Sequence, residues 1–339
     1  MTCGTIVVVS DTQVTASCAL PIGTAAGLGT IGVTTTGGTA TTAFTVTTPS
    51  FSLTSTTPSS ATRGNGSGGA NNVSVTLAGT GLSAVSPITA VTLTNTASGA
   101  TISCTVGATT DTSIAATCPL ASNAATGAGT ISATTQVGES NALAFTVNAG
   151  TPTITSVSPS AVVNGFGLGT ATYRETVTGT YLTGANSMAF TTNNNAFYGT
   201  CGAVTVVNDT TVYASCGATA ATTATRGLQV VTPGGTATGV NVAKAANVTA
   251  PGTLTIPRTG NSGSITFTAG GGLLGVSAVA SSGGMGVACV VQPGGTDTSV
   301  TAICTGTGTV AATNRTFTLT LGLNNSGQIR TGNVSVTQL

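Results

Sequence analysis

The stretch that decides the fold reads CTVGATTDTSIAATC and occupies residues 104–118. A cysteine stands at each end, and an Asp-Thr pair stands near the middle. A chain that reverses direction at this pair places two antiparallel strands side by side. The terminal cysteines then face each other with their α-carbons roughly 4.5 to 5.5 Å apart, which is within reach of a disulfide. The stretch therefore predicts a β-hairpin closed by a disulfide.

The same pattern occurs four times and uses all 8 cysteines of the chain. The predicted disulfides are Cys3–Cys18, Cys104–Cys118, Cys201–Cys216 and Cys289–Cys304. Closing a loop of about 15 residues stabilises a fold by on the order of 3 kcal/mol in chain-entropy estimates. Because disulfides persist in oxidising compartments, we expect a secreted protein, either extracellular or on the cell surface. Zinc binding, the other common use of paired cysteines, needs CxxC clusters or His, and the sequence has neither.

Apolar residues alternate with polar or small ones after each turn, as in Ile114, Ala116 and Cys118. A period of two is typical of a β-strand and places the cysteine on its apolar face. We therefore expect each disulfide to lie against a hydrophobic core. The four turn aspartates are expected to accept hydrogen bonds from backbone amides of their own turns, which is a structural role. These residues are Asp11, Asp111, Asp209 and Asp297.

The composition favours an all-β fold of tandem immunoglobulin-like β-sandwiches. Thr, Gly, Ala, Ser and Val dominate the 339 residues, which include only 7 basic and 6 acidic side chains and no His or Trp. Such a chain is poor in helix formers and rich in β-branched residues, so we expect essentially no helix. A net charge of +1 gives no electrostatic footprint for nucleic acid. No run approaches the roughly 18 apolar residues of a membrane helix, so neither nucleic acid binding nor membrane insertion is expected.

The repeat interval divides the chain into four segments, namely residues 1–48, 49–149, 150–246 and 247–339. The last three have the length of an immunoglobulin-like domain. Residues 1–48 match only the second half of such a domain, and they would leave an apolar face exposed to water. Two explanations remain open. Either an upstream segment, including an export signal, is missing from the sequence, or another molecule completes the half-domain, for example a copy of the same chain.

Residues 151–246 resemble the IPT/TIG family of immunoglobulin-like domains. The matching motifs, in family order, are Pro152 to Ser160, Thr176 to Leu182, Val206 to Val212 and Val231 to Thr236. Residues 49–148 share a smaller set, which includes Leu77 to Leu82. Residues 247–339 keep the cysteine hairpin but depart from the other motifs. The resemblance implies β-sandwich domains, and this domain type serves as spacer, receptor segment or enzyme accessory.

The sequence offers no catalytic constellation, so we expect no catalytic residue, metal or cofactor. Without His, only six carboxylates and Lys244 remain as bases. Apart from the turn aspartates the carboxylates are Glu139 and Glu175, which lie 36 residues apart in different segments. The run GLGTIG at residues 27–32 satisfies the dinucleotide-binding pattern GxGxxG. A strand follows it, whereas that motif requires a helix.

A candidate contact loop lies in the third segment, at Asn193, Asn194, Asn195, Phe197 and Tyr198. Aromatic and amide groups on a loop suit contact with a neighbouring subunit or a surface glycan. The alternative is that the aromatic residues of this segment only fill its core. Three functions follow: a structural subunit of a cell-surface fibre, stalk or filament, an adhesin or glycan-binding arm that uses residues 150–246, and accessory domains of a larger secreted enzyme.

Overall fold

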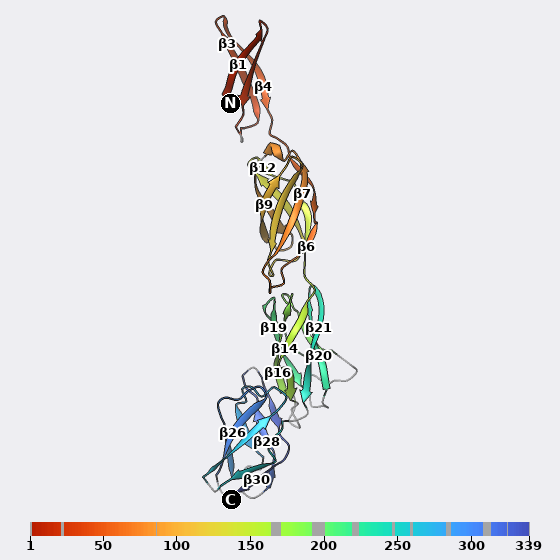
Figure 1. The fold of residues 1–339 in the computed structure, drawn as a ribbon, viewed down its shortest axis with the longest axis vertical. Helices are drawn as coiled ribbons and strands as arrows, with labels where there is room; N and C mark the ends of the chain where they lie inside the picture. The colour runs from red at the N-terminus through yellow and green to blue at the C-terminus, as the bar shows by residue number, and fades with distance from the viewer. Residues whose placement is uncertain are drawn as a thin grey trace. The chain divides into compact units, whose positions relative to one another are not determined.

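The structure is a computed structural model that describes most of the chain. The described residues are 2–21, 24–85, 87–163, 171–191, 201–218, 224–245, 248–257, 260–282, 286–307, 313–323 and 325–338. They form an all-β fold, as the sequence predicts (Figure 1). The only helical element described is a 3-10 turn, η1 (Ser83–Val85), and no described helix has the length and hydropathy to span a membrane.

The chain divides into two compact units. The first contains Met1–Arg63 and Ala70–Asn148, and the second contains Gly64–Gly69 and Ala149–Leu339. Both consist of β-sheets in their described residues. The division into four segments made from the sequence stays a prediction.

Two separate hairpins open the first unit. They consist of β1 (Thr2–Ser10) with β2 (Gln13–Ala19), and of β3 (Gly27–Thr35) with β4 (Gly38–Val46). Among the described residues, neither pair gains a third strand. The GxGxxG run lies within β3 and is therefore extended.

The rest of the first unit is a β-sandwich. Its strands follow the order β5-β7-β10-β9-β8-β11-β13-β6, with β12 beside β11. They are β5 (Ser52–Thr57), β6 (Ser60–Thr62), β7 (Asn71–Thr80), β8 (Ile88–Asn95), β9 (Thr101–Thr109), β10 (Ser113–Leu120), β11 (Gly127–Thr135), β12 (Gly138–Glu139) and β13 (Leu143–Asn148). Strand β10 buries Ile114, Ala116 and Cys118 and exposes the residues between them, as the alternation predicts.

The second unit opens with two facing four-stranded sheets, β14-β16-β19-β18 and β15-β21-β20-β17. Their strands are β14 (Thr153–Ser158), β15 (Ala161–Val163), β16 (Ala171–Thr180), β17 (Ser187–Phe190), β18 (Thr205–Asn208), β19 (Thr211–Ala218), β20 (Ala224–Thr232) and β21 (Gly235–Ala245). Strand β19 buries Val212, Ala214 and Cys216, which repeats the pattern of β10.

Three three-stranded sheets complete the second unit, in the orders β22-β30-β27, β23-β26-β25 and β24-β28-β29. Their strands are β22 (Thr253–Ile256), β23 (Ser262–Thr268), β24 (Ala278–Ser281), β25 (Val287–Val291), β26 (Ser299–Gly306), β27 (Thr313–Arg315), β28 (Phe317–Thr320), β29 (Gln328–Arg330) and β30 (Val334–Gln338).

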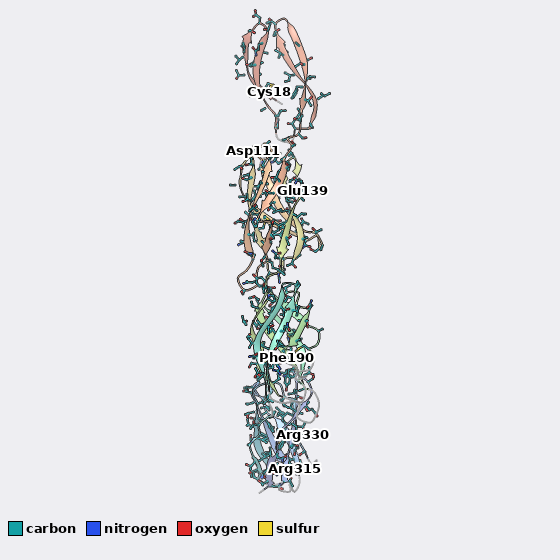
Figure 2. All side chains as sticks on the ribbon, turned by 90° about the vertical axis from the view of Figure 1, so that its right-hand side faces the viewer. Cys18, Asp111, Glu139, Phe190, Arg315 and Arg330 are labelled. Atoms are coloured by element: carbon teal, nitrogen blue, oxygen red, sulfur yellow. A yellow bond between two sulfur atoms is a disulfide. The ribbon has the colours of Figure 1, made fainter. Side chains whose placement is uncertain are left out.

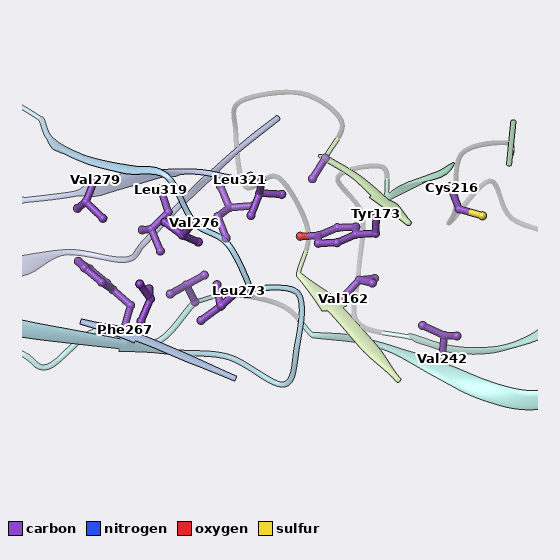
Figure 3. Close-up of a cluster of buried hydrophobic side chains, with 14 of the residues drawn as sticks. Val162, Tyr173, Cys216, Val242, Phe267, Leu273, Val276, Val279, Leu319 and Leu321 are labelled. Atoms are coloured by element: carbon purple, nitrogen blue, oxygen red, sulfur yellow. The ribbon is translucent and has the colours of Figure 1, made fainter. Parts of the chain in front are cut away.

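One continuous cluster of buried side chains runs through both sandwiches of the second unit (Figure 3). Tyr173 of β16 is fully buried, and its ring lies against the backbone of Gly272. A Cβ at Gly272 would approach the ring to 2.6 Å, and this glycine also has a φ of 84°, which favours glycine. Thr172 and Ser326 exchange two backbone hydrogen bonds of 2.8 and 2.9 Å. Strand β16 therefore packs against the chain around Gly272 and Ser326.

Removal of the Cys104–Cys118 disulfide tests the contribution of the cross-links. We expect the double substitution Cys104→Ala and Cys118→Ala to lower the local free energy of unfolding by about 3 kcal/mol, because the unfolded chain regains the freedom of the closed loop. Hydrogen exchange of the full chain, read on peptides from residues 71–148, measures this change. The matched control replaces Thr105 and Thr117, exposed partners in the same strand pair, by Ala. An equal loss in both variants would contradict the prediction.

Candidate functional site

The chain contains four repeated hairpins, and each of them is closed by a disulfide. The pairs are those predicted, with α-carbons 3.9, 4.2, 3.9 and 4.0 Å apart in chain order, closer than expected. Cys118, Cys216 and Cys304 are at most 1% exposed, so these disulfides lie against a core. The same expectation is wrong for the first hairpin, where Cys3 is exposed and Cys18 is half-buried (Figure 2). Among the described part of residues 2–48, the β1–β2 pair gains no third strand.

The residue that precedes each turn aspartate stabilises the turn locally. In the second hairpin the Oγ1 of Thr110 accepts a hydrogen bond from the amide of Thr112 at 3.3 Å. Ser10, Asn208 and Thr296 accept the equivalent bond in the other hairpins. We expected the aspartate side chain to accept a hydrogen bond from an amide of its own turn. This expectation is wrong, because the preceding Ser, Thr or Asn already accepts from that amide.

The aspartate instead binds a distant corner of the chain. The carboxylate of Asp111 accepts from the Oγ of Ser83 at 2.6 Å and lies 3.4 Å from the amide of Ser83. Two backbone carbonyls of the turn, those of Asp111 and Thr112, accept from the amides of Leu82 and Gly79 at 3.2 and 2.9 Å. We call this set of hydrogen bonds the corner clamp. It joins the hairpin turn to the end of β7, 28 residues earlier.

The corner clamp recurs in both sandwiches of the second unit. The Oδ1 of Asp209 accepts from the amide of Thr183 at 3.1 Å, and the Oδ1 of Asp297 accepts from the amide of Gly272 at 2.9 Å. The carbonyls of the two Asp-Thr turns accept from the amides of Leu182, Gly179, Leu273 and Ala269. Asp209 is 5% exposed, so this clamp is the most buried of the three.

Each corner has the same shape. The residue before the buried leucine has a positive φ, namely Gly81 at 71°, Tyr181 at 57° and Gly272 at 84°. Only glycine adopts such a backbone without strain, so Tyr181 holds a costly conformation. Gly79 and Gly179 lie against carbonyl groups of the preceding strand, which leaves no room for a side chain.

The first hairpin has the turn but no corner. Asp11 is exposed, and none of the corner-clamp bonds occurs there among the described residues. On one face of β1 and β2, Ile6, Val8 and Val14 are 59%, 71% and 40% exposed, and Val7 on the opposite face is 53% exposed. The residue equivalent to Val14 in the second hairpin, Ile114, is fully buried. This incomplete hairpin is the candidate interaction surface of the first unit.

Glu175 is a buried carboxyl group that the analysis of motifs missed. It lies on β16 between Tyr173 and Val177, faces the core and is 1% exposed. Its Oε2 has no hydrogen-bond partner among the described residues. Burial, followed by the negative charge of Asp297, raises the pKa of Glu175 from 4.5 to about 8. The period of two along β16 was the available signal, since it places Glu175 on the face of Tyr173.

The other candidate residues that the structure describes do not lie together in one site. The carboxylate of Glu139 accepts a hydrogen bond from Ser132 at 2.7 Å, and Lys244 lies in β21. The contact loop of Asn193, Asn194, Asn195, Phe197 and Tyr198 lies outside the described residues. Within the described ranges, no group of three or more His, Cys, Asp or Glu could hold a metal ion.

A polar cleft of about 300 Å³ lies in the second unit. Its lining residues are Ser158, Pro159, Arg174, Thr176, Leu274, Asp297, Leu323 and Asn325. The guanidinium of Arg174 stacks 3.5 Å from the centre of the Tyr213 ring, and its backbone amide donates to Asn325 at 3.2 Å. Both contacts hold Arg174 at the wall of the cleft.

Comparisons with known proteins give only remote matches. No protein-family model and no curated protein sequence matches the chain. Among solved structures, it is similar to SGBP-B of the mixed-linkage glucan utilization locus of Bacteroides ovatus, at 15% identity and a TM-score of 0.26 over 79% of this chain and 63% of that one. It is also similar to invasin, a bacterial integrin-binding protein, at 18% identity and a TM-score of 0.31 over 86% and 60%.

Domains A168–A170 of titin are similar at 12% identity and a TM-score of 0.29, over 79% of this chain and 94% of that one. The chain spans less than two thirds of SGBP-B and of invasin. These similarities concern the fold alone.

Substitution of the turn aspartates tests the corner clamp. We expect Asp209→Ala to lower the local stability of the second unit by about 1.5 to 3 kcal/mol, because a buried amide loses a charged acceptor. Asp209→Asn keeps an acceptor and should lose less. Asp11→Ala, which removes the same residue where no clamp exists, should leave stability unchanged. Hydrogen exchange across residues 176–218 and 2–21 measures these effects. An equal effect of Asp209→Ala and Asp11→Ala would contradict the assignment.

The raised pKa of Glu175 predicts a pH-dependent stability. Between pH 4.5 and about 8 the folded protein keeps a proton that the unfolded chain releases. The free energy of unfolding should therefore fall as pH rises through this window, by a few kcal/mol at most, and level off outside it. Glu175→Gln should remove this slope. Urea unfolding of both proteins across the window, followed by circular dichroism, measures it. A slope that persists in Glu175→Gln would assign it to another group.

Proposed function

We propose that the chain is a non-enzymatic extracellular structural protein, a subunit of a cell-surface fibre, stalk or filament. The observation that carries the proposal is that the repeated cysteines and turn aspartates make structural bonds. Every cysteine is oxidised within its own hairpin, and three of the four turn aspartates hold corners of their sandwiches. The repeated disulfides and hydrogen bonds of this chain therefore stabilise its individual sandwiches and hairpins.

A location outside the cytoplasm follows from the same residues. Four disulfides require an oxidising compartment, and the chain has no free cysteine. Cross-links also make local unfolding rare. This benefits a fibre, because a subunit that unfolds after assembly is not easily exchanged for a folded one.

The proposed partners are copies of the same chain. With 13 charged residues in 339 and a net charge of +1, little electrostatic repulsion keeps two molecules apart. The outward residues of β23 and β26 in the second unit form cross-strand Ser and Thr pairs, such as Ser262 with Thr305 at 2.7 Å and Thr266 with Thr301 at 2.9 Å. Such uncharged sheet faces are suited to lateral contact.

The finer family assignment is also a proposal. We infer that residues 151–246 form an IPT/TIG-type domain. In support, its motifs occupy structural joints. Ser158 ends β14 and Pro159 follows it, Gly179 to Leu182 form the corner, and Pro233 and Gly234 form the turn between β20 and β21.

A second candidate function is a glycan-binding arm, and the polar cleft of the second unit favours it. Arg174, Asp297 and Asn325 present hydrogen-bonding groups of the kind that sugar hydroxyls require, beside the apolar Leu274 and Leu323. A glycan array with the full chain tests this candidate. Binding that is lost in Leu274→Glu, at the exposed rim of the cleft, would favour it over the structural role.

Added charge tests the proposed assembly. The purified chain should form fibres or large particles in electron microscopy and light scattering. Ser264→Lys with Thr266→Lys, two exposed positions on β23, raises the net charge from +1 to about +3 and should raise the concentration needed for assembly several-fold. Ser264→Gln with Thr266→Gln is the matched control and should assemble normally. A dispersed wild-type monomer at all concentrations and ionic strengths would contradict the proposal.

A further inference from the structure

Strand β16 is joined at its edge to a segment of the last sandwich. Strand β14 pairs with β16 from Thr176 to Thr180. Nearer the start of β16, on the edge opposite β19, Thr172 pairs with Ser326 through backbone hydrogen bonds of 2.9 and 2.8 Å. The amide of Arg174 also donates to the side chain of Asn325 at 3.2 Å. The segment around Ser326 therefore continues the sheet along the edge where β14 pairs.

A second contact lies on the core face of β16. The ring of Tyr173 lies against Gly272, where a Cβ would approach it to 2.6 Å. The amide of Gly272 donates to the carboxylate of Asp297 at 2.9 Å, so the corner clamp of the last sandwich positions this contact. A Cβ on Gly271 would collide with the carbonyl oxygen of Ala161 and approach the Oδ2 of Asp297 to 3.0 Å. We call the two contacts together the β16 junction.

Glu175 places a carboxyl group beside this junction. It follows Tyr173 on the same face of β16, and same-face residues of a strand lie roughly 7 Å apart. Its side chain is 1% exposed, and its Oε2 has no hydrogen-bond partner among the described residues. An ionised carboxylate without a partner is strongly unfavourable in such a place, and Asp297 adds a second negative charge. The closed junction therefore requires the neutral acid.

The titratable and charged groups on the elements around Glu175 are Tyr173, Tyr213, Arg174, Arg226, Lys244 and Asp297. Arg174 and Tyr213 lie on the opposite face of their sheet and stack on each other. Arg226 lies on β20 of the facing sheet, where its guanidinium donates to a backbone carbonyl at 3.4 Å. The side chain of Lys244 in β21 lies outside the described residues, so the experiment includes this residue.

We propose that the β16 junction is a pH-sensitive latch, which is closed while Glu175 carries a proton and opens more often once that proton is lost. Opening releases the segments around Gly272 and Ser326 from β16. It lets water reach the carboxylate and separates the carboxylate from Asp297, so ionisation stabilises the open state relative to the closed one. The pKa of Glu175 is about 8 in the closed state and 4.5 where water surrounds the group. Rising pH therefore favours opening between these values, and the effect levels off above about 8.

The latch also affects the polar cleft of the second unit. The cleft is lined by Ser158, Arg174 and Thr176 on one side and by Leu274, Asp297 and Asn325 on the other. Because its two walls belong to the two sides of the β16 junction, opening separates them. The inference goes beyond the proposed function, since such a latch operates equally in a fibre subunit and in a free chain.

Hydrogen exchange of single backbone amides, measured by NMR spectroscopy on the full chain from pH 5 to 9, tests the latch. The reporters are the amides of Thr172, Arg174 and Ser326, which bond across the junction. The control amides, those of Gly179 and Leu182, bond within the corner clamp at the other end of β16. After correction for intrinsic rates, the reporters should be less protected than the controls. Their protection should fall by up to about tenfold per pH unit until about pH 8, the limit for one proton.

Three variants identify the group that titrates. Glu175→Gln should abolish the pH dependence of the reporters, because an amide stays neutral, and retained protection of the controls shows that this variant is folded. Asp297→Asn keeps an acceptor for Gly272 and removes a negative charge, so the fall in protection should end at a lower pH. Glu139→Gln removes an exposed carboxylate of the first unit, and this matched control should behave as the wild type.

Three results would overturn the latch. The first is a pH dependence of the reporters that persists in Glu175→Gln. The second is a pH dependence that disappears in Lys244→Met, because the lysine would then be the group that titrates or the partner of the carboxylate. The third is equal protection and equal slopes of reporters and controls, which would indicate unfolding of the whole unit in place of an opening at the junction.

Discussion

The corner clamp is the interaction on which the architecture depends. A disulfide joins the two strands of one hairpin, but it does not determine which strand pairs with the open edge of that hairpin. The clamp connects that hairpin to a strand about 25 to 28 residues earlier, by one carboxylate and two carbonyls that accept from corner amides. Buried amides need acceptors, so each corner can sit only where its Asp-Thr turn provides them. Disulfide and clamp together fix three strands of every complete sandwich.

The residue pattern predicted the hairpins well, because all the residues that determine a hairpin lie close together in the sequence. Residues 104–118 contain both cysteines, the turn and the apolar alternation, so pairing and facing follow from spacing alone. The partner of Asp111 could not be found in this way, because Ser83 belongs to another strand and carries no signal of its own. The sequence suggested a structural role for the aspartate, and this is what the structure has, but with a distant partner in place of a local one.

Glu175 illustrates a different limit. Its position between Tyr173 and Val177 predicts an inward side chain, and an inward carboxyl group predicts a raised pKa. The contribution of Asp297 was beyond prediction, because 122 residues separate the two and only the packing of the second unit brings their charges together. The same packing explains Gly271 and Gly272. A Cβ on Gly271 would collide with the carbonyl oxygen of Ala161, and a Cβ on Gly272 would collide with the ring of Tyr173.

The contrast between Asp11 and the other three aspartates also bears on the nature of the repeat. A turn that served only its own hairpin would need the Ser, Thr or Asn that precedes the aspartate, and nothing more. The aspartate contributes only when a corner is present. Its occurrence in the first hairpin, beside an apolar face that includes Val8 at 71% exposure, therefore indicates a hairpin whose sequence suits a covered state. Among the described hairpins, an exposed apolar face and a turn aspartate without a corner occur together only here, as expected for one half of a sandwich.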